Sequence, residues 1–597
     1  MKEDIEKRLT SLRDVMRRER LAAFIFPSTD AHQSEYVPDH WKGREWISGF
    51  NGSAGTAVVT MEAVALWTDS RYFLAAEKQL EGTEFQLMKL RVPGTPTIAQ
   101  WLGGQLADSD SKEVGIDGKV VSVAYARQLV DELRGEGGLT LRTNFDPLAV
   151  VWTDRPSLPY NNKVEIQPVE LAGESAEKKL ALIRKALRGL HTDGMLMSAL
   201  DDVAWTLNLR GRDVHCNPVF LSYLLIAPEW ATLFIDRRKL TPEVERYLSS
   251  VGVGAEEYAA VGKGLKDYFS YNILMDPKET GEVMPGYVDK HVKVVYADSP
   301  VPAMKAVKTD AEIKGFKAAM LRDGVAMVKF LRWLQPAVEA GGQTEMSVDR
   351  KLTELRAEQK RFRDISFDTI AGYGPHGAIV HYEASPETDV ELRPEGFLLL
   401  DSGAQYQDGT TDITRTIPLG PLTDEQCRIY TLVLKGHIRL AMAKFPDGAC
   451  GTQLDALARE PMWREGLNYL HGTGHGVGSY LNVHEGPHQI RMEYMPAPLR
   501  AGMTVTDEPG LYLQGKFGVR IENTMLVTHY TKGEFGDFLQ LAPLTLCPIA
   551  TTPIVLSMMT QEELDWLNDY HRMVYDRLSP LLDENERQWL ADATAAV

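Results

Sequence analysis

Four histidines are concentrated in residues 471–488, HGTGHGVGSYLNVHEGPH, where imidazoles could bind a metal ion or move protons. On a helix, the spacing of His471 and His475 would aim both rings at one ion. Glycine at every second position from 472 to 476 disfavours a helix. No glutamate follows His471, so the His-Glu zinc-protease pattern is absent. We therefore expect a loop that brings backbone close to a site, with the histidines pointing in different directions.

Two aspartates in FLLLDSGAQYQDGTTDITRTI could add metal ligands, because a buried aspartate in a strand is costly unless it is paired or coordinated. Asp401 ends an apolar run, and Asp412 lies within a Thr/Ile alternation. A two-residue turn at Asp408 and Gly409 would place Asp412 opposite Gln405, on the face of Asp401 but about 13 Å along the strand. Sharing an ion then requires a bulge or a displaced turn.

Two glutamates follow downstream. Glu508 ends an apolar strand against a Pro-Gly turn in MTVTDEPGLY, and GVRIENTMLV places Arg520 and Glu522 on one face of a strand. Taken alone, Glu522 is most simply a salt-bridged acid on a solvated face. Together, four carboxylates and one imidazole suit two divalent ions better than one. Such oxygen-rich ligation favours manganese, cobalt or zinc over a thiolate-bound metal.

The elements that must position these residues form three blocks. The first begins with an amphipathic helix, continues through the strand LAAFIFP and the glycine-rich SGFNGSAGTAVVT, and ends in AVALWTDSRYFLAAEKQL. After WTDRPSLPYNNK the same order of elements returns, and WATLFIDRRKL is similar to LWTDSRYFL. This recurrence predicts a degenerate duplication that gives two related α/β domains, at residues 1–155 and 165–298.

The third block, residues 305–597, contains every dense cluster of acids and histidines. Thr309 and Glu312 form a plausible capping box for a long helix that runs to about Leu334. Helices then alternate with short strands, which is typical of an α+β domain. From about Met558 a helical extension rich in Trp and Tyr is expected to pack against the domain body or a second subunit.

The whole chain of 597 residues has an ordinary globular composition, with 44% hydrophobic and 25% charged residues. No segment approaches the roughly 18 uninterrupted apolar residues of a membrane helix, and the charged N-terminus does not resemble a secretory signal. The four cysteines lack metal or disulfide spacing. The net charge of −18 argues against nucleic acid or an anionic membrane as a partner. A cytoplasmic location is expected.

Five motifs occur in a fixed order: GPHGAIVHY, DSGAQYQDGTTDITRT, HGTGHGVGSYLNVHEGP, DEPGLY and GVRIEN. In these motifs the chain resembles the pita-bread metallopeptidases, and within them the long, three-domain aminopeptidases P, also called Xaa-Pro aminopeptidases. The resemblance covers nearly the whole chain. It implies two N-terminal α/β domains followed by a C-terminal pita-bread catalytic domain.

The resemblance also assigns roles to individual residues. The implied metal ligands are Asp401, Asp412, His475, Glu508 and Glu522. The implied substrate-channel histidines, which bind no metal, are His381, His471 and His484, with Arg520 as a charged neighbour of Glu522. Arg71 is implied near the substrate, although a salt-bridged residue at a helix N-terminus explains it at least as well. His376 is expected to be a loop residue, and His488 has no assigned role.

The activity implied by the resemblance is removal of the first residue from peptides with proline at position two. The implied mechanism is attack on the scissile carbonyl by a hydroxide that bridges two ions, most simply Mn²⁺, with Co²⁺ or Zn²⁺ as alternatives. Glu508 would be ligand and general base, and His484 would stabilise the oxyanion together with the ions. His381 and His471 would shape the pocket. A homodimer formed through the C-terminal domain is also implied.

Two other functions fit parts of the pattern. A prolidase would use the same five ligands on dipeptides that end in proline, but prolidases resemble a shorter, two-domain chain. A catalytically silent pita-bread module would bind peptides or histones after losing ligands. The intact ligand positions and the acidic chain argue against this second alternative.

Overall fold

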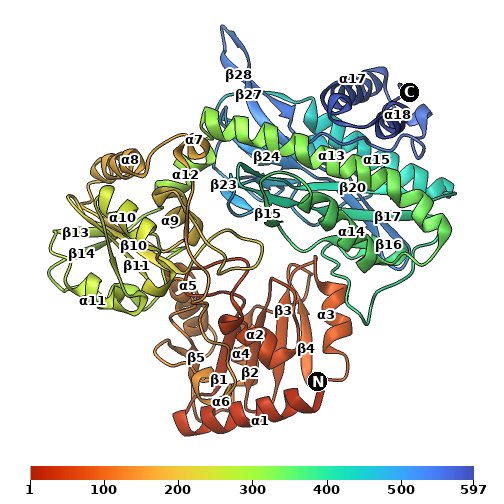
Figure 1. The fold of residues 1–597 in the computed structure, drawn as a ribbon. Coiled ribbons are helices and arrows are strands. Elements are labelled where there is room, and N and C mark those ends of the chain that lie inside the picture. The colour runs from red at the N-terminus through yellow and green to blue at the C-terminus, as the bar shows by residue number, and fades with distance from the viewer. Residues whose placement is uncertain (1) are drawn as a thin grey trace. The chain divides into compact units, whose positions relative to one another are not determined.

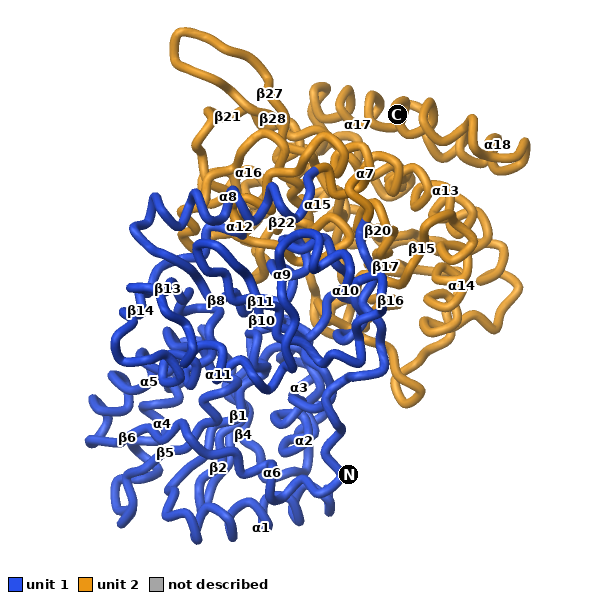
Figure 2. Tube along the Cα trace, turned by 60° about the vertical axis from the view of Figure 1, so that its left-hand side comes forward, with its two compact units in different colours: residues 1–167, 174–301 blue, residues 168–173, 302–597 orange. Residues whose placement is uncertain are grey.

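The computed structural model describes residues 2–597, which divide into two compact units (Figure 2). Unit 1 comprises residues 1–167 and 174–301, and unit 2 comprises residues 168–173 and 302–597. Each unit has its own sheets and its own hydrophobic cores. Within residues 2–597, no helix combines the length and the apolar character that crossing a membrane requires.

The first sheet of unit 1 has the strand order β4-β3-β2-β1-β5-β6. Its strands are β1 (Ala23–Pro27), β2 (Thr56–Thr60), β3 (Val64–Thr68), β4 (Phe85–Lys89), β5 (Glu113–Ile116) and β6 (Thr140–Arg142). Helix α1 (Lys2–Glu19) buries Ile5, Leu9 and Leu12 against the face that contains Phe24. Helices α4 (Ile98–Gln105) and α5 (Val123–Gly135) cover the opposite face, which contains Ile25. Successive strand residues thus supply two cores, as strand periodicity requires.

The second sheet of unit 1 has the order β12-β11-β10-β8-β13-β14. Its strands are β8 (Met195–Met197), β10 (Ser222–Ile226), β11 (Ala231–Ile235), β12 (Val253–Glu256), β13 (Asn272–Met275) and β14 (Lys293–Tyr296). In the first sheet, β2 pairs antiparallel with both β1 and β3. In the second sheet, β10 pairs antiparallel with both β8 and β11. All other strand pairs in the two sheets are parallel. The two sheets therefore share one strand order, which confirms the prediction of two related α/β folds.

Unit 2 begins its main body with helix α13 (Asp310–Ala340), whose N-terminus has the predicted Thr309 and Glu312 capping box. The helix continues past the predicted end at Leu334. Unit 2 also contains the short helix α7 (Val169–Ala172), most of the short helix α12 (Val301–Ala306) and the helices α14 (Glu345–Ala357), α15 (Asp424–Ala441), α16 (Gly451–Trp463), α17 (Gln561–Leu578) and α18 (Glu584–Ala593). Helix α17 packs on α13 and α15, and its Leu567 and Val574 are fully buried in a core shared with α15. The C-terminal extension therefore packs against the domain body.

The strands of unit 2 form small sheets between these helices. One sheet has the order β16-β17-β20, with β16 (Ile370–Tyr373), β17 (Phe397–Ser402) and β20 (Ile413–Pro418). Another has the order β21-β28-β27-β24, with β21 (Lys444–Pro446), β24 (Thr504–Asp507), β27 (Asn523–Gly533) and β28 (Gly536–Pro543). Two ribbons are formed by β22 (Gly474–Gly476) with β23 (Glu485–Ile490) and by β25 (Gly510–Leu513) with β26 (Phe517–Arg520). The β27–β28 hairpin extends beyond the rest of unit 2 (Figure 1).

Candidate active site

Asp401 and Asp412 lie closer together than the sequence predicted, because the turn between their strands is displaced. Tyr406 pairs with Gly409 between β18 (Ala404–Tyr406) and β19 (Gly409–Thr410), so the turn residues are Gln407 and Asp408. The predicted turn at Asp408 and Gly409 was wrong. In the observed register Asp401 pairs with Thr414, so Asp412 is only two residues from the partner of Asp401. Two residues span about 7 Å, whereas the predicted turn implied a separation of about 13 Å.

His475 lies on the short strand β22, and the loop before it is irregular, as the glycines predicted. Its Nε2 is 3.4 Å from Oδ2 of Asp412 and 3.3 Å from Oε1 of Glu508. Its Nδ1 is 2.8 Å from the carbonyl oxygen of Gly476. Because a carbonyl can only accept, Nδ1 donates to Gly476. Burial lowers the pKa of His475, but the hydrogen bonds and charges of Asp412 and Glu508 outweigh it and raise the pKa well above its ordinary value. Nε2 therefore donates to the acids until a metal ion displaces its proton.

Glu522 is buried rather than solvated, contrary to the simplest interpretation of its sequence position. Thr414 donates a hydrogen bond of 2.7 Å to its Oε2, and its backbone N–H donates to the carbonyl oxygen of Thr414 at 3.1 Å. One ligand-type atom from each of Asp412, His475 and Glu522 lies within 4.8 Å of the other two. Four segments that are distant in sequence therefore place their acids and one imidazole in a single cluster.

The cluster holds more negative charge than its own cations balance. Burial raises the pKa of Asp401 to about 6, with Asp412 and Glu508 adding to the rise and Arg520 opposing it. Burial and the same neighbouring acids raise the pKa of Glu522 well above its ordinary value. Within residues 2–597, Oδ1 of Asp401 and Oε1 of Glu522 are buried without a hydrogen-bond partner. Buried, unpaired carboxylate oxygens beside an imidazole nitrogen are a donor set that fits divalent cations.

A directed chain of hydrogen bonds joins Arg520 to His471. Arg520 donates to Oδ2 of Asp401 at 2.7 Å through Nη2 and to the hydroxyl of Tyr512 at 2.7 Å through Nη1. The Tyr512 hydroxyl is 2.8 Å from Nε2 of His471, whose Nδ1 is 2.7 Å from the carbonyl oxygen of Gly472. Nδ1 must donate, so Nε2 accepts from Tyr512. Burial lowers the pKa of His471 to about 4, which keeps the ring neutral.

The other predicted histidines have different surroundings. The ring of His484 stands at 88° to that of His475, with 4.3 Å between the centroids. His381 directly follows Val380, whose carbonyl oxygen accepts a hydrogen bond of 3.4 Å from Arg520. His484 therefore lies beside the acid cluster, and the main chain next to His381 contacts Arg520.

Two further histidines support the structure around the cluster. His376 lies in a 3-10 turn, where its Nδ1 contacts buried Glu345 at 2.9 Å and its ring stacks on Tyr382. His488 is buried beneath β22, and its Nε2 donates to the carbonyl oxygen of Thr504 at 2.7 Å. His376 was expected in a loop and lies in a 3-10 turn, and His488 had no expected role.

Several residues of the site were missed from the sequence. Tyr512 connects Arg520 to His471, Thr414 holds Glu522, and Thr506 donates a hydrogen bond of 3.0 Å to Oε1 of Glu508. A tyrosine two residues after a Pro-Gly turn and threonines in alternating strands are common in any β structure. No sequence signal separates them from ordinary strand residues.

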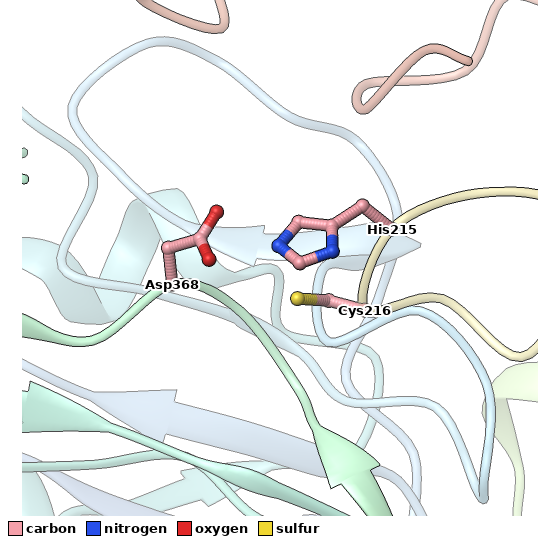
Figure 3. A group of neighbouring side chains, drawn as sticks. All are labelled: His215, Cys216 and Asp368. Atoms are coloured by element: carbon pink, nitrogen blue, oxygen red, sulfur yellow. The ribbon is translucent and has the colours of Figure 1, made fainter. Parts of the chain in front are cut away.

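Arg71 belongs to unit 1, where it forms a two-point ion pair with Asp69 through bonds of 2.8 Å. This contact matches the salt-bridge alternative, and a role near the substrate stays a prediction. Figure 3 draws His215 and Cys216, consecutive residues of unit 1, and Asp368 of unit 2. These three side chains belong to two different units, and no metal site is assigned to them.

Gly474 allows the loop of His475 to approach β24. A Cβ atom at Gly474 would lie 1.9 Å from the carbonyl oxygen of Thr506, two residues before Glu508. Gly474→Ala should therefore separate β22 from β24 and lower the stability of unit 2 by about 1–3 kcal/mol. The unfolding midpoint in urea should fall. Gly472→Ala is the matched control, because its Cβ meets nothing nearer than 3.7 Å; equal midpoints for the two variants would contradict the expectation.

Known protein families match nearly the whole chain. Residues 314–529 match the model of metallopeptidase family M24, and residues 537–597 match the C-terminal region of peptidase M24. Residues 8–143 and 154–312 match models of creatinase/prolidase N-terminal domains. A probable Xaa-Pro aminopeptidase P of Paracoccidioides brasiliensis is 40% identical over 618 residues, which cover 100% of this chain and 99% of the relative. The chain belongs to metallopeptidase family M24.

Two further relatives support membership of this family. Aminopeptidase P2 of Arabidopsis thaliana is 39% identical over 99% of this chain and 88% of the relative. The crystal structure of the X-prolyl aminopeptidase of Caenorhabditis elegans, described as a cytosolic enzyme with a di-nuclear active site, superposes with a TM-score of 0.94. It is 35% identical and covers 99% of this chain and 100% of its own. The predicted fold class is confirmed, and the chain is a metal-dependent peptide hydrolase.

Proposed function

We propose that the protein hydrolyses the first peptide bond of peptides whose second residue is proline, releasing the N-terminal residue. The observation that carries this proposal is the convergence of Asp412, His475 and Glu522 within 4.8 Å in a chain related over its full length to proteins named Xaa-Pro aminopeptidase P. A Xaa-Pro bond has no N–H to donate. Recognition of the bond must therefore come from other groups, such as the carbonyl oxygen and the free amino terminus.

Two divalent ions fit the acid cluster, and we propose Mn²⁺, because carboxylate-rich sites favour hard cations. The residues that would hold them are Asp401, Asp412, His475, Glu508 and Glu522. When bound, the ions would polarise the scissile carbonyl and lower the pKa of a water molecule. His475 is prepared for ligation because Gly476 fixes its tautomer.

The surrounding side chains would handle protons and position the peptide. Burial raises the pKa of Glu508, but His475, by hydrogen bond and charge, outweighs it and lowers the pKa to about 2. Glu508 is therefore ionised and can accept a proton from water. His484, next to His475, would donate to the developing oxyanion. Neutral His471, with both nitrogens already hydrogen-bonded, and His381 would shape the pocket, with Arg520 beside them.

One assay tests the proposal directly. Metal-depleted protein is reconstituted with Mn²⁺ and given an Xaa-Pro-Pro tripeptide and an Xaa-Pro dipeptide in parallel. The expected result is release of the first residue from the tripeptide alone, with activity lost on chelation and restored by Mn²⁺. Cleavage of the dipeptide alone would reassign the protein as a prolidase. No cleavage with two equivalents of bound metal would favour a peptide-binding module.

We also propose the domain boundaries 1–155, 165–298 and 305–597. The ranges matched by three family models support these boundaries. The first range ends at residue 143 and the second begins at residue 154, and the second ends at residue 312 and the third begins at residue 314. A cytoplasmic location is proposed by analogy with the C. elegans enzyme, which is described as cytosolic.

A homodimer through unit 2 is a further part of the proposal. Exposed apolar side chains occur on α16 and on the segments that flank the β22–β23 ribbon, namely Leu457, Trp463, Leu470, Met492 and Tyr494. Exposed apolar surface of this kind is typical of an interface. Tyr494→Glu should convert a dimer into a monomer in analytical ultracentrifugation. Leu556→Glu, which replaces a leucine that is 54% exposed elsewhere in unit 2, should leave the dimer intact; a monomeric wild type would contradict the proposal.

A further inference from the structure

Arg415 is a buried arginine directly behind the acid cluster, on strand β20. All of its hydrogen bonds go to neutral acceptors, and within residues 2–597 it forms no ion pair. Its acceptors are the carbonyl oxygens of Thr414 (3.0 Å), Glu522 (2.6 Å), Cys547 (2.9 Å) and Pro548 (2.9 Å), Oδ1 of Asn523 (2.8 Å) and the hydroxyl of Tyr570 (3.0 Å). A guanidinium offers five N–H groups in a rigid plane. Arg415 therefore fixes several segments relative to one another.

Two of these hydrogen bonds fix the segment that carries the proposed ligand Glu522. Arg415 holds the carbonyl oxygen of Glu522, and the neighbouring Thr414 hydroxyl holds its Oε2 at 2.7 Å. Arg415 also binds the side chain of Asn523, the next residue along the chain. Arg415 thus holds the main chain and the following residue at Glu522, while Thr414 holds its carboxylate.

Tyr570 connects this arrangement to the C-terminal helix α17. Its hydroxyl lies 3.0 Å from Arg415, and its ring stacks on Trp566 with 5.4 Å between centroids and an interplanar angle of 5°. The edge of Trp566 in turn faces the ring of His437 at 5.8 Å. Tyr570 is only 3% exposed, so packing fixes the position of its hydroxyl.

His437 of α15 links Tyr570 and Asn523 to the second proposed glutamate ligand, Glu508. Its Nδ1 lies 3.1 Å from the carbonyl oxygen and 3.3 Å from Oδ2 of Asp507, the residue before Glu508. Its Nε2 lies 3.3 Å from Nδ2 of Asn523. Asp507 and Asn523 are register partners at the start of the β24–β27 pairing. Arg415 and His437 therefore contact the residues next to both glutamates, Asp507 beside Glu508 and Asn523 beside Glu522.

We propose that Tyr570, acting through Arg415 and Asn523, is a positioning residue for Glu522, so that the C-terminal extension sets the affinity of the site for its metal ions. This inference rests on the proposed ligand set. Removing the Tyr570 hydroxyl takes away one of the three acceptors around Nη2 of Arg415 and also the contact of 3.3 Å between that hydroxyl and Oδ1 of Asn523. Both residues that hold the main chain at Glu522 thereby lose a fixed neighbour. Groups that orient metal ligands typically change metal affinity by 10- to 100-fold when they are replaced.

The test compares Tyr570→Phe with Tyr430→Phe in the full-length protein. Tyr430 is a matched control, because it belongs to the same core and its hydroxyl donates to Ala550 at 2.7 Å without bonding Arg415. Free Mn²⁺ is measured by its electron paramagnetic resonance signal during a titration, alongside kcat at saturating Mn²⁺ and the unfolding midpoint. Tyr570→Phe should raise the Kd for Mn²⁺ by about tenfold, with kcat recovering at saturation. Tyr430→Phe should retain the wild-type Kd.

Arg415→Lys provides a second variant, which keeps the charge but loses the planar set of donors. It should weaken Mn²⁺ binding at least as much as Tyr570→Phe, and the double variant should weaken binding by less than the two single effects combined, because the two side chains bond each other. Unchanged binding in Tyr570→Phe, or equal weakening in Tyr570→Phe and Tyr430→Phe, would overturn the inference. A wrong ligand assignment would be recognised by a different result. If Glu522 is not a ligand, the Glu522→Gln variant will still bind two equivalents of Mn²⁺.

Discussion

Replacing Asp401 by asparagine should lower kcat/KM for an Xaa-Pro-Pro tripeptide by about 10³-fold or more at fixed Mn²⁺. A bound metal ion contributes several kcal/mol of transition-state stabilisation, and each 1.36 kcal/mol is tenfold in rate. Asparagine keeps the shape of the side chain but removes the negative charge that faces the cluster. It also leaves Arg520 without the carboxylate that it contacts at 2.7 Å.

The loss should occur without unfolding, because the pairing of Asp401 with Thr414 in the β17–β20 register is made by the main chain. Bound metal should be measured by elemental analysis and the fold by circular dichroism. Asp323→Asn is the matched control, since Asp323 is a buried acid of unit 2 whose partner is Arg356 at 2.9 Å, outside the cluster. Near-normal turnover of the Asp401→Asn variant with two bound ions would remove Asp401 from the ligand set.

Replacing Glu508 by glutamine should lower kcat by about 10²- to 10⁴-fold, the range that general acid–base catalysis supplies. Glutamine preserves an oxygen that can face a metal ion, but it cannot accept a proton. Thr506, which donates to Oε1 of Glu508 at 3.0 Å, can still hold the amide oxygen in place. KM for the tripeptide should therefore change much less than kcat.

Measurement of metal content separates the two roles of Glu508. A variant that keeps two ions and loses kcat has lost a proton acceptor, whereas a variant that loses an ion has lost a ligand. Glu563→Gln should retain wild-type kcat, because Glu563 is a buried glutamate whose partners are Lys435 and Arg439 on α15. A Glu508→Gln variant with wild-type kcat would contradict both roles.

Local chemistry made several features of the site predictable. The glycines around His475 ruled out a helix because they lack helix propensity, and the observed segment is a loop with a short strand. Thr309 and Glu312 predicted a helix start because a capping box depends only on residues three positions apart. The repeated order of elements predicted two similar sheets, since each element forms from its own stretch of chain.

The contacts that build the acid cluster could not be predicted in this way. The predicted turn at Asp408 and Gly409 places Asp412 opposite Gln405. The observed turn lies one position earlier, at Gln407 and Asp408, and its register places Asp412 opposite Gly403, two residues nearer to Asp401. Nothing local chooses between those turns. Register is decided by which side chains the neighbouring strands and helices bury.

The sequence by itself determined which residue types could hold metal and that His471 and His475 do not share a helix. Only the tertiary structure decided that Glu522 is buried, that Tyr512 joins Arg520 to His471, and that Tyr570 reaches Arg415 across 155 positions of the chain. The physical reason is that burial and hydrogen-bond partners depend on segments far apart in sequence. Propensity and spacing describe only the residues nearby.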